Sequence, residues 1–438
     1  MSTEIFHSNN NHHHSNNHYN CIPNGSHRGS DLSDLSDFDI EELIRMHKLC
    51  RQVSIESPGP VVKDCVFSFV VPVPDTPENG ARVKVVYAGA CYRRQKSPSI
   101  SSMSSISSDL SELAQQMAGS PHSSAASPAH HGYRDGALFP GFEVAGVIEE
   151  LGPGVSQNKE NGFYVGQRVV LYPFDDCPNG YAEYIVVPDL KYLIPIPDSF
   201  PLSVAAMLPT GALLAMNTVF EAQEILSHLL KEREAAYAAN PETSPPPLCR
   251  ILIVGTGGLA LWAVRIAAYH FHQLESSKKV QITVASLRDE GFMLAKDFEN
   301  VNVVQWSEDL YEKQLIERTV DACGGAVDIV IDFGTTSRSL HRSIQCLSKG
   351  GVVLVSEEVG EKLLPKFSSL ADKREVKLRS VADGTIEQLK QLVELVSSHE
   401  IEPPPHSVFP FDDAQEVVRK LCHSEIPGRA ILKFHDIE

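Results

Sequence analysis

The sequence ILIVGTGGLA at residues 251–260 places an apolar run directly before a glycine-rich turn. The following stretch, LALWAVRIAAYHFHQ, has the apolar spacing of a helix. Gly255 allows a tight turn, Gly257 lets a ligand approach the backbone without meeting a Cβ atom, and Ala260 lets the helix pack closely on the strand. This G-x-G-x-x-A pattern between a strand and a helix predicts a binding site for a dinucleotide diphosphate at the helix N-terminus. The residues predicted to contact the cofactor here are Gly255, Thr256, Gly257, Gly258, Leu259 and Ala260.

The chain continues after this turn with apolar strands that alternate with helical stretches. The predicted strands include VQITVASL, NVNVVQW, AVDIVIDFG and GGVVLVS, between residues 280 and 356. Strands that are apolar throughout and separated by helices indicate a parallel, doubly wound sheet that is covered on both faces. We therefore predict a Rossmann domain over residues 206–380, with Gly334 also lining the cofactor site.

The end of the second predicted strand indicates which dinucleotide binds. Enzymes that use NAD place an acidic residue there to hold the ribose 2′-hydroxyl. This chain has Ser286 and Arg288 instead, with no acidic residue before Asp289. A guanidinium suits a phosphate group, so the pattern favours NADPH, with NADH as the alternative. An exposed arginine in a loop is the competing interpretation of Arg288.

The segment before the Rossmann domain is typical of short strands. β-Branched runs separated by turn residues begin at Val61, and GFEVAGVIEELGPGV, GQRVVLYPF and YAEYIVVPDLKYLIPIPDSF continue the pattern. Such strands predict a small β-barrel over residues 61–205. The final stretch, residues 381–438, is predicted to return to this domain.

Two stretches of biased composition are predicted to be disordered. One is an N-terminal tail over residues 1–60, and the other is a serine-rich insertion over residues 96–131. Both contain too few apolar residues to offset chain entropy. Residues 37–49 could form a short amphipathic helix that binds a protein partner, although a solvated tail is the simpler interpretation. The inserted serines are candidate phosphorylation sites.

Composition excludes several classes of function. The net charge of −18 over 438 residues opposes binding to nucleic acid or to an anionic membrane. The nine cysteines never form a C-x-x-C pair, which argues against a disulfide framework or a structural zinc site. We find neither an apolar run of about 20 residues nor a secretory signal, so a cytoplasmic protein is expected.

The order of these segments resembles the medium-chain dehydrogenase/reductase superfamily over residues 61–434. That family combines a GroES-like β domain, a Rossmann domain and a C-terminal return. The resemblance rests on YAGAC (87–91), FPGFEVAGVIEELGPGV (139–155), GYAEYIVVP (180–188), AAMLPTGAL (205–213), ILIVGTGGLA (251–260) and VDIVIDFG (327–334). It implies an α/β enzyme that acts on a small-molecule substrate, and it implies a homodimer.

The sequence departs from the zinc-dependent members of that superfamily. Cys91 occupies the first ligand position, but Phe142 stands where the family has histidine and Thr210 stands at the third position. A catalytic zinc site needs about three protein ligands, and phenylalanine cannot supply one. The four-cysteine lobe of the zinc alcohol dehydrogenases is also missing. No zinc is therefore expected.

Without these zinc ligands, the chain resembles the zinc-free branch of the superfamily, the quinone oxidoreductases and enoyl reductases. The candidate catalytic residues are Cys91, Glu143 and two possible proton donors, Tyr92, which follows Cys91, and Tyr133. Tyr133 stands before FPGFE, as a tyrosine does in enoyl thioester reductases. The competing interpretations are that Cys91 is a small buried apolar residue and that the tyrosines serve in packing.

Three functions follow from these patterns. The first is a zinc-independent, NADPH-dependent oxidoreductase that reduces quinones, enones or carbonyls by hydride transfer. The second is a pseudoenzyme of the same fold, which acts as a cofactor-binding scaffold or regulator through its tail and insertion. The third is an atypical zinc-dependent alcohol dehydrogenase.

Overall fold

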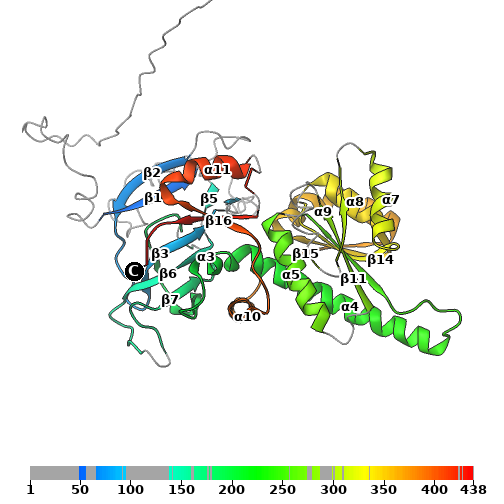
Figure 1. Cartoon of the computed structure of the whole chain (residues 1–438), viewed down its shortest axis with the longest axis horizontal. Helices are drawn as coiled ribbons and strands as arrows, with labels where there is room; N and C mark the ends of the chain where they lie inside the picture. The colour runs from blue at the N-terminus through cyan, green and yellow to red at the C-terminus, as the bar shows by residue number, and fades with distance from the viewer. Residues whose placement is uncertain are drawn as a thin grey trace, which may run out of the picture. The chain divides into compact units, whose positions relative to one another are not determined.

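The computed structural model shows a β-rich lobe and a parallel-sheet lobe within the unit spanning residues 47–438 (Figure 1). The structure describes residues 49–55, 66–90, 92–94, 138–140, 142–158, 162–174, 177, 180–255, 257–273, 279–286, 298, 301–307, 310–334, 336–422, 425–426 and 428–437. Most of the predicted tail and the whole predicted insertion lie outside these residues.

A seven-stranded sheet forms most of the β-rich lobe, with β17 pairing antiparallel to β3 and parallel to the edge strand β16. The last strand of the chain thereby sits beside a strand from near its start. The strand order is β16-β17-β3-β6-β7-β9, and β8 also pairs with β3. The strands are β3 (Ala81–Gly89), β6 (Val144–Leu151), β7 (Arg168–Leu171), β8 (Tyr184–Val187), β9 (Leu193–Pro195), β16 (His406–Pro410) and β17 (Arg429–Lys433).

A second, four-stranded sheet corrects one prediction from the sequence. Its order is β2 (Val66–Pro72), β1 (Leu49–Ile55), β5 (Leu138–Pro140) and β4 (Tyr92–Arg94). Strand β1 lies inside the stretch 1–60 that was predicted to be a disordered tail, and it pairs with β2 along its whole length. Cys50 and Val53 are buried against the lobe, and the Arg51 side chain pairs with Glu183 at 2.9 Å. Pairing with the next strand of the chain stabilises a segment whose own sequence does not alternate clearly enough to predict it.

The parallel-sheet lobe has the strand order of a Rossmann fold. Its six strands run β12 (Val301–Gln305), β11 (Val280–Ser286), β10 (Cys249–Val254), β13 (Val327–Asp332), β14 (Leu347–Ser356) and β15 (Lys377–Val381). Numbered along the chain, this is the order 3-2-1-4-5-6, and all five strand pairs are parallel. The predicted doubly wound parallel sheet and β-rich region are confirmed.

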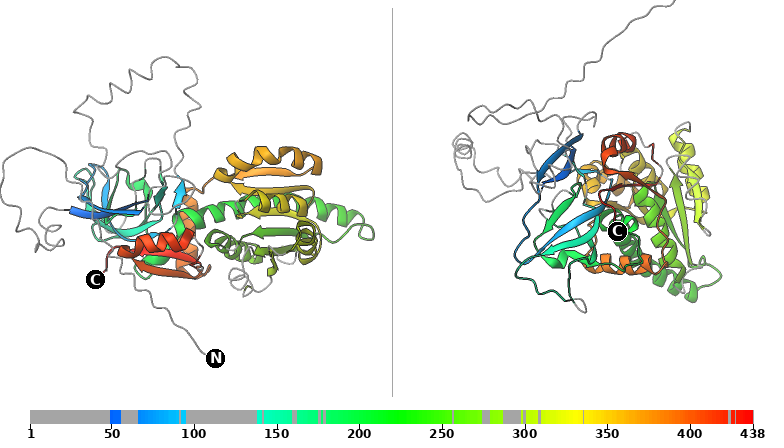
Figure 2. Two further views of the ribbon diagram at one scale, coloured as in Figure 1. Left: turned by 90° about the horizontal axis from the view of Figure 1, so that it is seen from above. Right: turned by 60° about the vertical axis from the view of Figure 1, so that its left-hand side comes forward.

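Helices cover both faces of the parallel sheet because its strands are apolar on both sides (Figure 2). In β10, Ile251 and Ile253 pack with the helices on one face, while Leu252 and Val254 pack with those on the other. The first face carries α4 (Leu213–Ala239), α5 (Gly258–Gln273) and α10 (Ile386–Ser397), and the second carries α7 (Glu312–Ala322), α8 (Ser337–Cys346) and α9 (Glu357–Arg374).

Several short elements complete the described part of the chain. They are α3 (Leu202–Ala205), the π-helical turn η4 (Leu208–Ala212), α11 (Ala414–Cys422), and the 3₁₀ turns η3 (Leu190–Tyr192) and η6 (Phe411–Asp413). The turn η4 runs directly into α4. No helix in the described ranges is both long and apolar enough to cross a membrane.

Candidate functional site

The strand order of the parallel sheet creates a candidate site at the carboxyl ends of its strands. After β10 the chain continues to β11 and β12 on one side of β10, and it then crosses to β13 on the other side. Open α/β sheets bind ligands at such a switch point, outside the carboxyl ends of the strands. Gly255 directly follows β10, Ser286 is the last residue of β11, and Gly334 lies two residues after the end of β13. All three were predicted to line the cofactor site.

The turn after β10 has the geometry that its glycines predict. Gly255 adopts a φ of +112°, a conformation that favours glycine, and its N–H donates to the Ala285 carbonyl at 2.9 Å. A Cβ atom on Gly257 would meet nothing within 4 Å, so this position faces open space. Ala260 is buried, and its Cβ would lie 3.4 Å from a Cβ on Gly255. A bulkier residue at either position would separate the strand from the helix.

Helix α5 begins at Gly258, and the side chain of Arg429 lies against that first residue. A Cβ atom on Gly258 would overlap the Cδ atom of Arg429. Arg429 comes from β17 of the β-rich lobe, so its position joins the C-terminal return to the turn of the Rossmann lobe. A cation at a helix N-terminus is electrostatically unfavourable, because the unpaired N–H groups there carry partial positive charge. An anion held between the helix and the guanidinium would offset this repulsion.

Glu143 supplies one negative charge to this site. It stands immediately before β6 with its side chain fully buried, and it forms an ion pair with Arg429, whose side chain is 13% exposed. Its other oxygen accepts hydrogen bonds from the Thr210 hydroxyl and, at 3.1 Å, from the Gly211 N–H in η4. A buried carboxylate is tolerated only when it is paired and hydrogen-bonded, as this one is.

The third strand end is organised by Asp332, the last residue of β13. This carboxylate is 2% exposed and accepts the Gly334 N–H at 2.8 Å and the Ser343 hydroxyl at 2.9 Å. Burial raises the pKa of Asp332 to about 6, although the Gly334 and Ser343 hydrogen bonds act in the opposite direction. Asp332 therefore fixes the turn at Gly334 beside the turn at Gly255.

The structure brings together some of the predicted site residues and leaves others outside its description. Glu143, Gly255, Gly257, Gly258, Leu259, Ala260, Ser286 and Gly334 are all placed, and Ser286 is fully buried at the end of β11. Cys91, Tyr133, Thr256 and Arg288 lie outside the described residues. Tyr92 is described only as part of the backbone of β4, where it pairs with Pro140.

Arg429 was not predicted from the sequence. Arg429 reaches Glu143 across 286 residues of chain, and no local pattern in IPGRAILKF marks it as a site residue. Thr210 was noticed only as the residue at a lost metal position, and Asp332 only as part of a landmark segment. Within the described residues, no three His, Cys, Asp or Glu side chains gather closely enough to hold a metal ion.

Comparison with known families identifies both lobes. Residues 77–198 match the model of the alcohol dehydrogenase GroES-like domain. Residues 310–432 match the model of the zinc-binding dehydrogenases. The two matches fall on the β-rich lobe and on the later part of the Rossmann lobe with the C-terminal return.

The chain is also similar to curated proteins along most of their lengths. It is 24% identical over 319 residues to a zinc-type alcohol dehydrogenase-like protein of Schizosaccharomyces pombe, covering 68% of this chain and 82% of that protein. It is 25% identical over 291 residues to a quinone oxidoreductase of Rattus norvegicus, covering 65% of this chain and 76% of that protein. It is 21% identical over 333 residues to an NADP-dependent alcohol dehydrogenase of Mycolicibacterium smegmatis, covering 67% and 81% of the two chains.

Solved structures show the same fold. The acetophenone reductase of Geotrichum candidum, solved in complex with NAD, superposes with a TM-score of 0.55 at 17% identity, covering 89% of this chain and 98% of that one. The two matched domains, the relatives and the shared fold agree. The chain belongs to the medium-chain dehydrogenase/reductase superfamily of NAD(P)-dependent enzymes and is an oxidoreductase related to alcohol dehydrogenases and quinone oxidoreductases.

Proposed function

We propose that this protein is a zinc-independent, NADPH-dependent oxidoreductase that reduces quinone, enone or carbonyl substrates. The observation that carries the proposal is the position of Arg429 against the first turn of α5, beside the open space at Gly257. This arrangement combines backbone N–H groups, a partial positive charge and a guanidinium, a set of donors that complements a diphosphate.

The residues at the site fit a bound dinucleotide. The diphosphate would rest on the N–H groups at Gly257 and Gly258 and on Arg429, which its ion pair with Glu143 holds in place. Gly334, fixed by Asp332, would flank the bound dinucleotide from the neighbouring strand. NADPH is favoured over NADH because β11 ends at Ser286 without an acidic residue for the ribose 2′-hydroxyl.

Two features support a site without catalytic zinc. Phe142, next to Glu143, cannot ligate a metal, and it occupies the position of a ligand in zinc-dependent relatives. Both carboxylate oxygens of Glu143 are already engaged, one by Arg429 and the other by Thr210 and Gly211. Glu143 would have to give up these partners in order to bind a metal.

NADPH, when bound, supplies the hydride for the reduction. The protein must orient it, exclude water and deliver a proton to the substrate. The pair of Glu143 and Arg429 joins β6 and β17 to the start of α5, so it holds the cofactor turn against the β-rich lobe. Tyr92 and Tyr133 remain the predicted proton donors.

Cofactor titration, turnover and metal analysis of the full-length protein test this proposal together. We expect fluorescence titration to give tighter binding of NADPH than of NADH, and we expect NADPH oxidation with at least one quinone, enone or carbonyl. Enzyme treated with a chelator should keep its activity. Binding without any turnover would favour the cofactor-binding scaffold, and near-stoichiometric zinc whose removal abolishes activity would favour an atypical zinc dehydrogenase.

A double substitution isolates the role of Arg429. Removing Arg429 alone would leave a buried carboxylate unpaired and destabilise the fold, so E143Q is combined with R429M. We expect the double variant to melt normally and to bind NADPH at least about tenfold more weakly, because a charge-assisted hydrogen bond is lost. The matched control is E416Q/R419Q, which removes an exposed ion pair on α11. Equal NADPH affinity in the two double variants would remove Arg429 from the cofactor site.

A further inference from the structure

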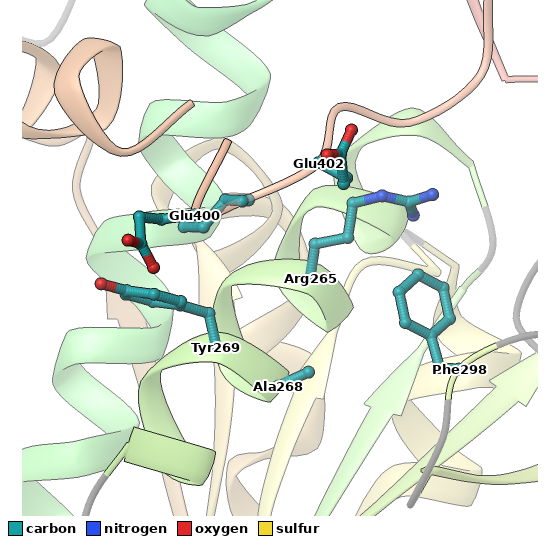
Figure 3. Close-up of a pocket in the computed structure, with 7 residues that line it drawn as sticks. Arg265, Ala268, Tyr269, Phe298, Glu400 and Glu402 are labelled. Carbon is teal, nitrogen blue, oxygen red and sulfur yellow. The ribbon is translucent and has the colours of Figure 1, made fainter. Parts of the chain in front are cut away.

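A pocket of about 340 Å³ lies beside α5 (Figure 3). Arg265, Ala268 and Tyr269 from α5 line it, together with Phe298 and the segment 400–402 that leads from α10 back to the β-rich lobe. Arg265 stands seven residues beyond Gly258, which places it about 10 Å along the helix axis. This pocket is therefore separate from the proposed dinucleotide site.

Arg265 is a half-buried cation with unusually few partners. Its Nε atom is buried without a hydrogen bond, and its only hydrogen bond within the described residues is a 3.5 Å contact from Nη1 to the Leu261 carbonyl one turn earlier. The guanidinium carbon lies 4.6 Å from the centre of the Phe298 ring. Burial lowers the pKa of Arg265 to about 10, although the negative charge of Glu402 acts in the opposite direction. A guanidinium shielded from water in this way favours an anionic partner.

Other arginines with a buried, unbonded Nε atom have strong partners elsewhere on their guanidinium groups. Arg168 and Arg374 each donate to backbone carbonyls, with bonds of 2.6 Å and 3.0 Å respectively. Arg429 forms its ion pair with Glu143. Among these described arginines, Arg265 alone lacks such a bond. A buried donor without a partner in a pocket that opens to solvent indicates a place for an acceptor from outside the chain.

The walls of the pocket restrict the chemistry of that acceptor. Phe298 and Tyr269 present aromatic rings, and Ile401 adds a buried aliphatic side chain. Glu400 and Glu402 stand at the exposed margin, and Figure 3 shows Glu400 on the Tyr269 side and Glu402 near Arg265. Two carboxylates at the margin repel phosphates and other polyanions. A ligand with a single negative charge on an apolar body meets less of this repulsion and can still pair with Arg265.

We propose that this pocket is a second ligand site, which takes a small carboxylate attached to a flat, apolar body. The carboxylate pairs with the guanidinium of Arg265, and the apolar body lies between Phe298, Tyr269 and Ile401. An edge-on guanidinium can donate two parallel hydrogen bonds to a carboxylate, a geometry that lysine cannot reproduce.

Isothermal titration of the full-length protein with 2-naphthoate tests this site. We expect saturable binding of 2-naphthoate, and no binding of its uncharged analogue 2-naphthalenemethanol or of inorganic phosphate at the same concentration. R265Q should weaken binding at least about tenfold, and R265K should also weaken it because the paired hydrogen bonds are lost. The control R419Q, at a half-exposed arginine on α11, should bind as the wild type does.

A second variant keeps the test decisive if R265Q fails to fold. Glu402 has a side chain that is 73% exposed, so E402Q is expected to fold normally. Removing its charge should tighten 2-naphthoate binding about two- to fivefold, because one repulsive carboxylate is lost near Arg265. Absence of saturable binding to the wild type, equal affinity in a folded R265Q, or an unchanged affinity in E402Q would each overturn the proposal.

Discussion

Asp332 offers the clearest effect of pH on stability at the scale of a single residue. Its pKa in the folded protein is about 6, above the ordinary value of 3.8, because burial penalises the charged form. Between these two values the unfolded chain releases the proton while the folded chain keeps it. The stabilising contribution of the protonated group is therefore complete below about pH 4, and it is lost as pH rises through about 6.

The substitution D332N removes this titration. We expect the free energy of unfolding of the wild type, relative to D332N, to fall by about 2 kcal/mol between pH 4.5 and pH 7. Urea unfolding of both proteins across this range measures the difference, and other titrating groups cancel in the comparison. Parallel pH profiles for the two proteins would show that Asp332 does not titrate in this window.

Single residues also show how far the sequence alone could predict the site. Gly255 and Ala260 were predicted because their roles depend only on neighbours within the same turn. Arg429 and Asp332 could not be assigned roles in this way. The partner of Arg429 is 286 residues away, and Asp332 depends on Ser343 from the following helix as well as on the nearby Gly334 N–H.

At the scale of elements, a buried ion pair fastens the later half of α4 to the base of the parallel sheet. Arg233 donates to Asp328 at 2.6 Å and 3.0 Å, and Asp328 also accepts the Arg250 N–H at 2.9 Å. The side chain of Asp328 is 4% exposed, whereas that of Arg233 is 35% exposed. The pair therefore stabilises the attachment of α4 mainly by satisfying a buried carboxylate.

We expect R233M to lower the free energy of unfolding by about 2–3 kcal/mol, because Asp328 loses its charged partner while backbone and hydroxyl donors remain. The matched control is R379M. It breaks the exposed ion pair with Glu221 and should cost at most about 1 kcal/mol. Chemical denaturation of both variants makes the comparison, and equal losses would show that burial of Asp328 is not what gives the pair its strength.

Strand β1 gives a second prediction for a whole element. A chain that begins at His47 keeps β1, whereas a chain that begins at Glu56 loses it together with the buried side chains of Cys50 and Val53. Each buried apolar side chain stabilises the fold by about 1.5–3 kcal/mol, so the shorter chain should melt at a clearly lower temperature than the longer one. Equal melting temperatures in thermal denaturation would contradict the role of β1 in the fold.

The same strand shows why the sequence predicted the strands of the parallel sheet but not β1. Strands β10, β13 and β14 contain nearly continuous apolar runs because both of their faces are buried. Strand β1 has the sequence LCRQVSI, in which polar Gln52 is buried beside Val53. Neither alternation nor an apolar run marks such a strand, and only its pairing with β2 reveals it.

At the scale of the whole molecule, the cofactor site depends on contacts between distant parts of the chain. The β-rich lobe supplies Glu143, the C-terminal return supplies Arg429, and the Rossmann lobe supplies the turn and α5. Short-range periodicity predicted each lobe but not this meeting of three segments. We therefore propose, as the central claim about the assembled molecule, that the turn from Gly255 to Gly258 binds the diphosphate of a dinucleotide.

The most direct test of that claim is the affinity of G257A for NADPH, measured by fluorescence titration beside the wild type. A Cβ atom at this position meets no protein atom within 4 Å, so the variant should keep the wild-type melting temperature without ligand. The added methyl group would stand between the backbone and the diphosphate. We predict NADPH binding at least about tenfold weaker, with a smaller rise in melting temperature on adding NADPH. An unchanged NADPH affinity in a normally folded G257A would contradict the claim.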